Sequence, residues 1–194
     1  MTPRELEEYR ALRDTIRQRG TARIWVFLAG LVAWGALTLA TAALAALPVA
    51  TFLPLLILAA TFESVFGLHV GVERIGRYVQ VFLETDGGWE HVAMAVGRPL
   101  KGTGSDPLFT AHFIIAVLLN TVPALLAQPL AIEVWVVLTV HALVIARILL
   151  AHRVASHQRA ADLRRFQEES AKYKGQSSKQ AGTLKLRSTL SFAL

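Results

Sequence analysis

Four apolar blocks constrain the fold of this chain more than any other feature of its sequence. They cover residues 24–46, 49–72, 108–127 and 130–150, about 20 residues or slightly more each. A helix of that length crosses a hydrocarbon core roughly 30 Å thick. A soluble bundle would need a polar stripe along every block, and the first block has none between Ile24 and Ala46. The blocks therefore predict an all-α integral membrane bundle of four transmembrane helices.

Composition narrows the class of protein further. With 54% apolar residues in 194, the chain is too apolar for an ordinary soluble domain. It has no cysteine, which excludes a disulfide framework, a thiolate nucleophile and a cysteine metal site. The net charge of +6 comes from basic residues that flank the apolar blocks. We therefore expect the lipid bilayer, and no nucleic acid, as a partner.

The distribution of basic residues predicts an orientation. Residues 1–23 hold six arginines, residues 71–107 hold four Lys or Arg, and the chain after Ala146 holds ten, whereas the turns at 47–48 and 128–129 hold none. If the four spans form two hairpins, every basic segment lies on one side of the membrane. The positive-inside rule then makes both termini and the middle loop cytoplasmic.

The resulting organisation has four parts. The capping box Thr2-Pro-Arg-Glu5 opens an amphipathic helix that we expect Gly20 to end or bend. After Lys172 the chain carries four more basic residues besides that lysine, no acids and much Ser, Gln and Gly, which is typical of disorder. The predicted parts are a cytoplasmic amphipathic helix (1–20), a transmembrane domain (21–151) with a cytoplasmic loop (73–107), a cytoplasmic helix (152–171) and a disordered basic tail (172–194).

The segment after the second block has two faces. His69, Glu73 and Arg77 follow one another at four-residue spacing and form an ionic face. The opposite stripe is apolar and consists of Ile75, Tyr78, Val79 and Phe82. We therefore expect this helix to leave the membrane and bend to lie at the cytoplasmic interface, followed by a second short interfacial helix at 89–96.

Small and polar residues inside the blocks indicate helix contacts. Small residues at four-residue spacing let helix backbones approach closely. The first block is dense in small residues, among them Ala29, Gly30 and Ala33, so we expect it to be a packing helix. The second block has two such pairs, Ala60 with Ser64 and Gly67 with Gly71, which favour a contact with the first. In the third block Pro123 removes a backbone hydrogen bond and predicts a kink. Asn120 and His141 are expected to form interhelical hydrogen bonds.

Ionisable residues within the blocks are functional candidates, because burying them in lipid is unfavourable. At 1.5 Å per residue, Glu63, His112 and Arg147 lie about 9, about 6 and about 5 Å from the inner surface, and His69 lies just beyond them. We interpret them as a polar cluster in which Glu63 pairs with Arg147 or His112, although Arg147 is also long enough to reach the interface alone. A proton or ion path through Glu63 is an alternative interpretation. A third is a metal site drawn from Glu63, His69, Glu73, Glu90, His91 and His112.

Two stretches support a resemblance to known proteins. They are Leu68-His-Val-Gly-Val-Glu-Arg-Ile-Gly-Arg-Tyr78 with Trp89-Glu90, and Glu8-Tyr-Arg-Ala-Leu-Arg-Asp-Thr-Ile-Arg17. The chain resembles small, uncharacterised bacterial inner-membrane proteins with four spans over about residues 5–165. The resemblance implies a multi-pass protein of the bacterial inner membrane and no particular activity.

These observations favour a non-enzymatic function. The chain has no nucleophile motif, phosphate loop or dinucleotide fingerprint, so we expect no catalytic residue and no cofactor. The first hypothesis is an accessory or scaffold subunit that associates with itself or with another membrane protein. The alternatives are a small transporter or channel subunit that uses Glu63 and, third, an intramembrane Glu/His metalloenzyme.

Overall fold

The structure of the protein is a computed structural model. It describes residues 1–44, 47–84, 87–96, 107–127 and 129–191. All regular elements in these ranges are helical. In chain order they are α1 (Pro3–Leu44), the 3-10 helix η1 (Pro48–Thr51), α2 (Phe52–Phe82), α3 (Trp89–Val96), α4 (Pro107–Asn120), α5 (Val122–Leu126) and α6 (Ala131–Ser191).

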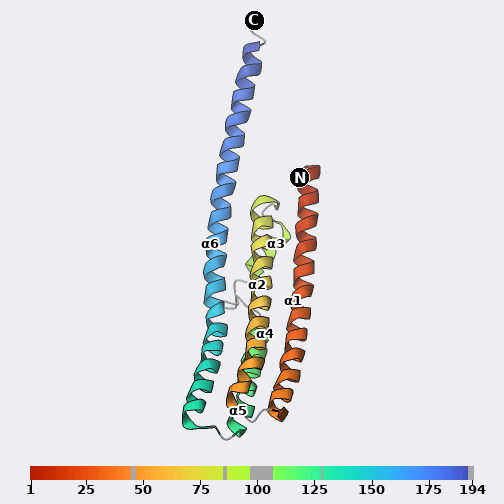
Figure 1. Cartoon of the computed structure of the whole chain (residues 1–194). Coiled ribbons are helices and arrows are strands. Elements are labelled where there is room, and N and C mark those ends of the chain that lie inside the picture. Colours follow the sequence, from red (N-terminus) through yellow and green to blue (C-terminus); the bar gives the residue numbers. More distant parts are fainter. Residues whose placement is uncertain (45–46, 85–86, 97–106, 128, 192–194) are drawn as a thin grey trace.

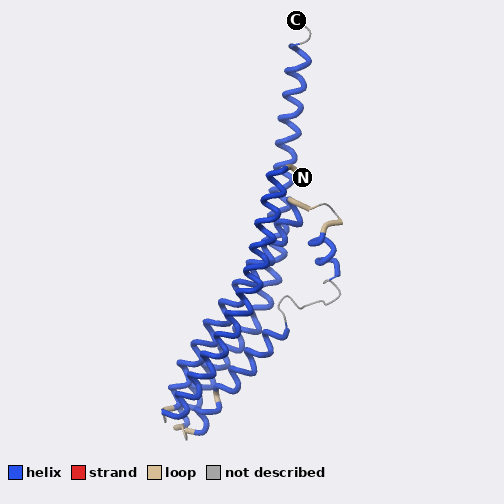
Figure 2. The backbone as a smooth tube through the Cα atoms, turned by 90° about the vertical axis from the view of Figure 1, so that its right-hand side faces the viewer, coloured by secondary structure: helices blue, strands red, loops and turns tan. Residues whose placement is uncertain are grey.

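The helices form a long, narrow bundle (Figures 1 and 2). The short helices η1 and α5 lie at one end and both termini lie toward the other, where α6 extends well beyond its neighbours. Four helical stretches are long and apolar enough to cross a membrane: 3–43, 48–82, 109–126 and 131–176. The prediction of an all-helical chain with four such helices is confirmed.

The first helix is longer than the sequence predicts. We expected Gly20 to end or bend an N-terminal helix, but α1 continues through it from Pro3 to Leu44. A single glycine lowers helix stability by only about 1 kcal/mol relative to alanine, which is too little to stop a helix with good helix formers on both sides. The capping box does form, because the backbone N–H of Thr2 donates to Glu5 and that of Glu5 donates to the Thr2 hydroxyl.

The second helix also continues where we expected a bend. α2 is unbroken to Phe82, and its apolar stripe packs on other helices. The rings of Tyr78 and Phe82 lie 5.8 and 6.2 Å from the ring of Phe166 on α6. On the other side the Tyr78 hydroxyl donates a 2.8 Å hydrogen bond to Glu8 of α1. The helix continues beyond the apolar block because α1 and α6 run beside it there and pack on its stripe.

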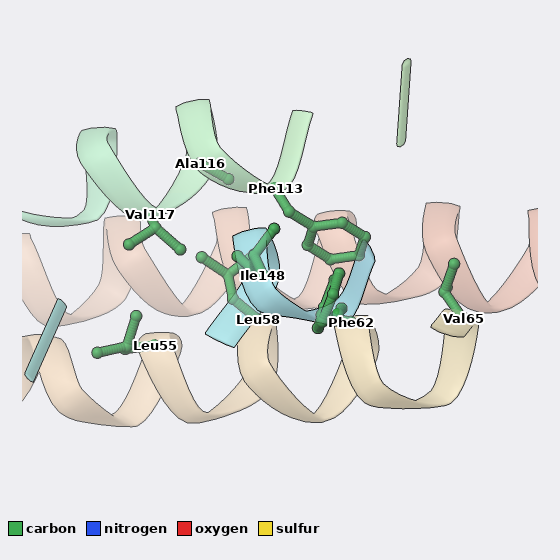
Figure 3. Close-up of a cluster of buried hydrophobic side chains, with 9 residues drawn as sticks. Leu55, Leu58, Phe62, Val65, Phe113, Ala116, Val117 and Ile148 are labelled. Atoms are coloured by element: carbon green, nitrogen blue, oxygen red, sulfur yellow. The ribbon is translucent and has the colours of Figure 1, made fainter. Parts of the chain in front are cut away.

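The hydrophobic core lies among α2, α4 and α6 (Figure 3). Its buried residues are Leu55, Leu58, Phe62, Val65, Phe113, Ala116, Val117, Ile148 and Ala151. α1 covers this core with partly buried Val26, Phe27, Leu31 and Trp34. Branched and aromatic side chains make up most of this core, and Ala116 and Ala151 are its small members.

Gly30 of the first apolar block lies in a contact with α2, as its small residues predict, whereas most of the small residues paired in the second block do not lie in a contact. A Cβ atom at Gly30 of α1 would overlap the side chain of Thr61 on α2, so this glycine is required for the contact. By contrast, Gly67 has open space around it among the described residues, and Ala60 and Ser64 are exposed. These three project from the face of α2 opposite the core, because the large apolar residues between them take the inner face. Gly71 faces the side chain of Arg19.

The third apolar block is interrupted as its proline predicts. α4 ends at Asn120 and α5 begins at Val122, with Pro123 in the first turn of α5. The predicted short helix at 89–96 is present as α3, while residues 97–106 of the predicted loop lie outside the described residues.

The last helix extends into the region where composition is typical of disorder. α6 is helical to Ser191, and residues 192–194 lie outside the described part of the chain. The segment after Lys172 contains no proline, and its two glycines, Gly175 and Gly182, do not interrupt the helix.

Candidate functional site

Glu63 and Arg147 form the ion pair that the sequence suggests. A guanidinium nitrogen of Arg147 lies 2.7 Å from a carboxylate oxygen of Glu63. The two side chains are 48% and 42% exposed, so the pair lies on the outer surface between α2 and α6, not inside the bundle. The guanidinium also lies over the rings of Phe62 and Phe66, at 5.9 and 5.4 Å from their centres.

The two histidines of the predicted cluster lie in other surroundings. His112 of α4 is exposed and meets the ring of Phe27 edge-on at 5.9 Å. His69 lies 3.0 Å from Arg23 of α1 and 3.6 Å from Glu73. The four residues of the predicted cluster therefore do not form one group: Glu63 pairs with Arg147, while His112 and His69 each contact α1.

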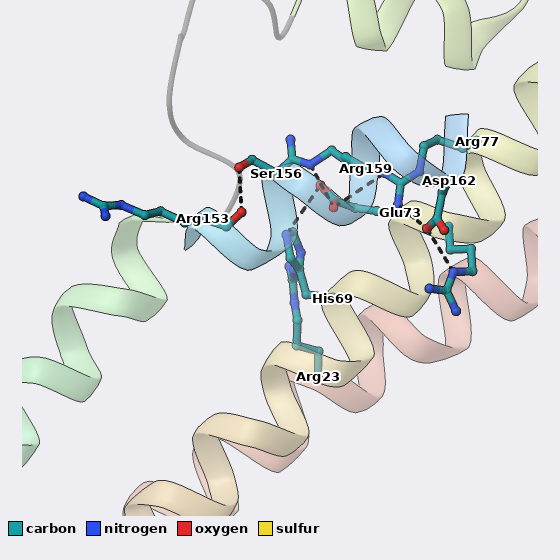
Figure 4. A network of polar contacts seen from close by, with 9 residues as sticks. Arg23, His69, Glu73, Arg77, Arg153, Ser156, Arg159 and Asp162 are labelled. Carbon is teal, nitrogen blue, oxygen red and sulfur yellow. Dashed lines mark hydrogen bonds and ion pairs between the residues drawn. The ribbon is translucent and has the colours of Figure 1, made fainter. Parts of the chain in front are cut away.

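A second set of charged residues gathers just beyond the apolar blocks (Figure 4). We call it the arginine cluster; it contains Arg23, Arg74, Arg77 and Arg159 together with His69, Glu73 and Asp162. Within it α2 and α6 are joined by two carboxylates. Asp162 of α6 lies 3.0 Å from Arg74 and 3.3 Å from Arg77. Glu73 of α2 lies 3.2 Å from Arg159 and 3.7 Å from Arg77.

The contacts around Glu73 are ion pairs without good hydrogen-bond geometry. Its oxygen Oε2 accepts no hydrogen bond from any described residue, although two guanidinium groups lie within 4 Å of it. The same holds for five buried donor atoms: Nε of Arg23, Nε and Nη1 of Arg77, and Nε and Nη2 of Arg159. Arg77 is the most deeply placed of these residues, with only 3% of its side chain exposed.

Burial and charge act in opposite directions on the groups of this cluster. Burial lowers the pKa of Arg77, and the nearby Glu73 and Asp162 only partly offset this effect. For Asp162 burial raises the pKa, but hydrogen bonds from Arg74 and Arg77 and their positive charges outweigh burial, so the pKa falls below its ordinary value.

The tautomer of His69 follows from its neighbours. An arginine can only donate, so Nδ1 of His69 must accept the hydrogen bond from Arg23. The remaining proton then lies on Nε2, the atom that faces Glu73 at 3.6 Å. His69 is therefore neutral in this arrangement and adds no charge to the cluster.

A third polar group, the Asn120 network, is uncharged and lies toward the other end of the bundle. The Asn120 side chain is fully buried and uses both of its polar atoms. Its oxygen accepts from the indole of Trp34 at 3.0 Å and from the hydroxyl of Thr38 at 3.3 Å. Its nitrogen donates to the backbone oxygen of Thr51 at 2.9 Å and to Nε2 of His141 at 3.0 Å. The predicted pairing of Asn120 with His141 thus occurs within a network that joins α1, η1, α4 and α6.

The geometry of this network fits one tautomer of His141. Nδ1 of His141 lies 2.8 Å from the backbone oxygen of Val137 and must donate to it. Nε2 is then free to accept from Asn120, and each polar group in the chain of contacts has a matching partner. Such a satisfied, buried network fixes the relative positions of four helical segments.

A fourth group, which holds α3 in place, had no counterpart in the sequence analysis. Arg13 of α1 lies 2.6 Å from Glu90 and 2.8 Å from Glu84. The carboxylate of Glu90 also fits against Gly76 of α2, where a Cβ atom would lie 3.0 Å from it. α3 is thereby held against α1 and α2.

The candidate metal ligands are divided among these groups. Glu63 pairs with Arg147, His69 and Glu73 belong to the arginine cluster, and Glu90 and His91 lie near Glu84. Within the part of the chain that the structure describes, no three His, Asp or Glu side chains are arranged to hold a metal ion.

The sequence analysis found Glu73 and Arg77 but missed their partners. Arg159 and Asp162 lie about 85 residues further along the chain, and their contact with α2 depends on how two long helices align. One signal was present: Arg159 and Asp162 are three residues apart, so they share a helix face.

No protein-family model, curated protein or solved structure matches the chain.

Proposed function

We propose that this chain is a non-enzymatic scaffold of the bacterial inner membrane that crosses the bilayer in two hairpins and pairs with a second copy of itself. The four apolar helices support the membrane assignment. The common direction of the two termini and the basic residues near them support a cytoplasmic location for both.

The observation that carries the pairing is the exposed Glu63–Arg147 ion pair. It lies within the apolar part of α2 and α6, at a depth where the surroundings would be lipid. Charged groups in contact with lipid are unfavourable, and they usually face protein or water instead. A neighbouring protein helix over this surface would remove the pair from lipid.

The surroundings of the ion pair suit a second helix. Ala60, Ser64 and Gly67 are exposed on the same face of α2 and present little side-chain volume. Between α2 and α6 a recess of about 220 Å³ is lined by Glu63, Arg147 and apolar residues. Small side chains permit close backbone approach, and the recess accepts side chains from the partner.

A second copy fits this face because the face carries both charges. In a two-fold symmetric pair, Glu63 of one copy and Arg147 of the other can exchange partners without a net change in charge. The outward direction of Glu63 also favours association over the proton or ion path, which would need a carboxylate facing an internal route.

The absence of native cysteine makes a direct test possible. Single-cysteine variants Ala60→Cys and Ser64→Cys are oxidised in native membranes, and Val32→Cys on α1, where Val32 is 72% exposed, is the control. We expect disulfide-linked dimers for the two α2 variants and only monomer for the control, because the Cα atoms must come within about 7 Å.

Two outcomes would contradict this proposal. Equal cross-linking of Val32→Cys would indicate random collisions in the membrane. Monomer for all three variants would exclude pairing through this face. Cross-linking of the α2 variants to a different protein would retain the scaffold function but replace the second copy as its partner.

A further inference from the structure

The arginine cluster has more positive charge than its carboxylates can neutralise. It contains four guanidinium groups, from Arg23, Arg74, Arg77 and Arg159, against the carboxylates of Glu73 and Asp162. Because His69 is neutral, the described side chains leave an excess of two positive charges.

Hydrogen bonding shows the same imbalance. Five guanidinium nitrogens of Arg23, Arg77 and Arg159 are shielded from solvent and have no acceptor among the described residues. Buried donors of this kind normally have a partner, and charged ones most of all. Only 3% of the Arg77 side chain is exposed, so solvent water does not supply the missing acceptors. An anion with several oxygens would supply acceptors for these donors.

The position of the cluster relative to the apolar blocks indicates where such an anion would be. Arg23 directly precedes the first block, and Arg77 lies five residues after Val72, or about 8 Å along α2. Lipid headgroups occupy a layer of roughly 5 to 8 Å on each side of the hydrocarbon core. The donors therefore lie at the depth of lipid phosphates.

An aromatic groove leads away from the cluster toward the hydrocarbon. Arg23 and His69 lie at the groove, whose walls are formed by α2 and α4 and consist mainly of Phe62, Phe66, Phe109 and Phe113. Its enclosed part has a volume of only about 30 Å³, so it is an open furrow and not a chamber for a small molecule. A cationic end joined to an apolar furrow matches a phosphate group attached to an acyl chain.

We propose that the arginine cluster binds a phosphate group, supplied by the headgroup of an anionic phospholipid or by free phosphate. The guanidinium fork matches phosphate oxygens in pairs, which makes arginine well suited to this ligand. Arg159 is the residue best placed to reach it, since its contact with Glu73 is an ion pair without hydrogen-bond geometry and its side chain is 29% exposed. This inference does not depend on self-pairing, which uses Glu63 and Arg147.

The experiment compares two arginines of the same helix. Arg159→Gln removes a donor of the cluster, whereas Arg164→Gln removes an exposed charge from α6 outside it. Full-length protein in neutral detergent is titrated with phosphatidylglycerol, phosphatidylcholine or inorganic phosphate, and binding is followed by native mass spectrometry and tryptophan fluorescence.

We expect the original protein to bind phosphatidylglycerol, and Arg159→Gln to bind it about tenfold more weakly, as loss of one charge-assisted contact predicts. Arg164→Gln should change the dissociation constant by less than about twofold, as expected for a screened surface charge. If inorganic phosphate binds and displaces the lipid with the same dependence on Arg159, free phosphate is a ligand; if it does not, the lipid is.

Three results would overturn the proposal: equal weakening by the two substitutions, no weakening by Arg159→Gln, or no preference of the original protein for phosphatidylglycerol or phosphate over phosphatidylcholine. Circular dichroism checks that both variants remain helical. If Arg159→Gln is misfolded, Arg23→Gln replaces it, because Arg23 approaches the same site from α1 and the same tenfold loss is expected.

Discussion

The Asn120 network and the arginine cluster both join helices that are distant in sequence, but they differ in how completely their polar atoms are satisfied. The side-chain oxygen of Asn120 accepts a hydrogen bond from Trp34, and its nitrogen donates to Thr51 and His141. In the arginine cluster, Arg77 and Arg159 each have two buried nitrogens without an acceptor among the described residues. The hydrogen bonds of the Asn120 network are therefore complete without a ligand, and those of the arginine cluster are not.

This difference separates a structural role from a binding role. Leaving a buried donor without an acceptor is unfavourable, so a group that serves only to hold helices should evolve toward the complete state. Incomplete groups persist where something else completes them. Disturbing the Asn120 network should therefore lower stability strongly, whereas removing one surplus arginine should not.

The largest effect is expected for Asn120→Leu. The substitution leaves the indole of Trp34 and Nε2 of His141 without their partner in the buried interior, while the Thr38 hydroxyl keeps its 2.8 Å hydrogen bond to the backbone oxygen of Trp34. We expect the free energy of unfolding to fall by about 3 kcal/mol. Reversible unfolding in mixed detergent micelles measures this value.

The control for this substitution is Thr121→Val, at the next position. The Thr121 side chain is exposed, and its hydroxyl bonds only the nearby backbone oxygen of Leu118, so a change below about 0.5 kcal/mol is expected. Equal losses for the two variants would mean that the Asn120 network has no special role.

An intermediate and pH-dependent effect is expected for Asp162→Asn. Because the pKa of Asp162 in the folded protein is below its ordinary value of 3.8, its charge stabilises the fold above about pH 4. This contribution is lost as the pH falls through the lowered pKa. We expect Asp162→Asn to be less stable by about 2 kcal/mol at neutral pH and the difference from the original protein to shrink in acid.

Thermal unfolding between pH 7 and pH 3 tests this expectation for Asp162. Glu168→Gln removes an exposed acid from the same helix and should behave like the original protein at every pH. A stability difference for Asp162→Asn that stays constant with pH would show that the carboxylate charge is not the cause.

The smallest effect is expected for Arg159→Gln in the absence of a phosphate ligand. It removes one of the surplus charges and two unsatisfied nitrogens, which offsets the loss of the contact with Glu73. Stability measured in zwitterionic detergent should therefore change by less than about 0.5 kcal/mol. A loss as large as that for Asp162→Asn would show that Arg159 is needed for folding and that the cluster is complete without a ligand.

The sequence predicted what depends on local pattern. The apolar blocks located the four long helices, Pro123 located the interruption after Asn120, and the spacing of Glu73 and Arg77 indicated their contact. These features arise from residues within a few turns of one another, so no knowledge of helix packing was needed.

The predictions that failed depend on how helices face one another. The rise per residue predicts a similar depth for Glu63, His112 and His69, but depth does not fix the direction in which a side chain projects, and the three have different neighbours. Gly67 was expected in a helix contact but lies in open space among the described residues, because Phe62 and Val65 turn the opposite face of α2 toward the core. The expected contact of the first block does form, through Gly30 and Thr61. Rotation of a helix about its axis is set by the partners, which the sequence of one helix does not contain.

The unbroken course of α6 has a mechanical consequence. Its apolar part ends near Leu150, and the 1.5 Å rise per residue places Ser191 about 60 Å farther along the axis. A helix that projects this far acts as a lever: a tilt of about 10° in the membrane moves the far end by about 10 Å. Arg159 and Asp162 form ion pairs with α2 near the base of this projecting segment. A small displacement of α6 at these ion pairs therefore becomes a larger displacement at Ser191.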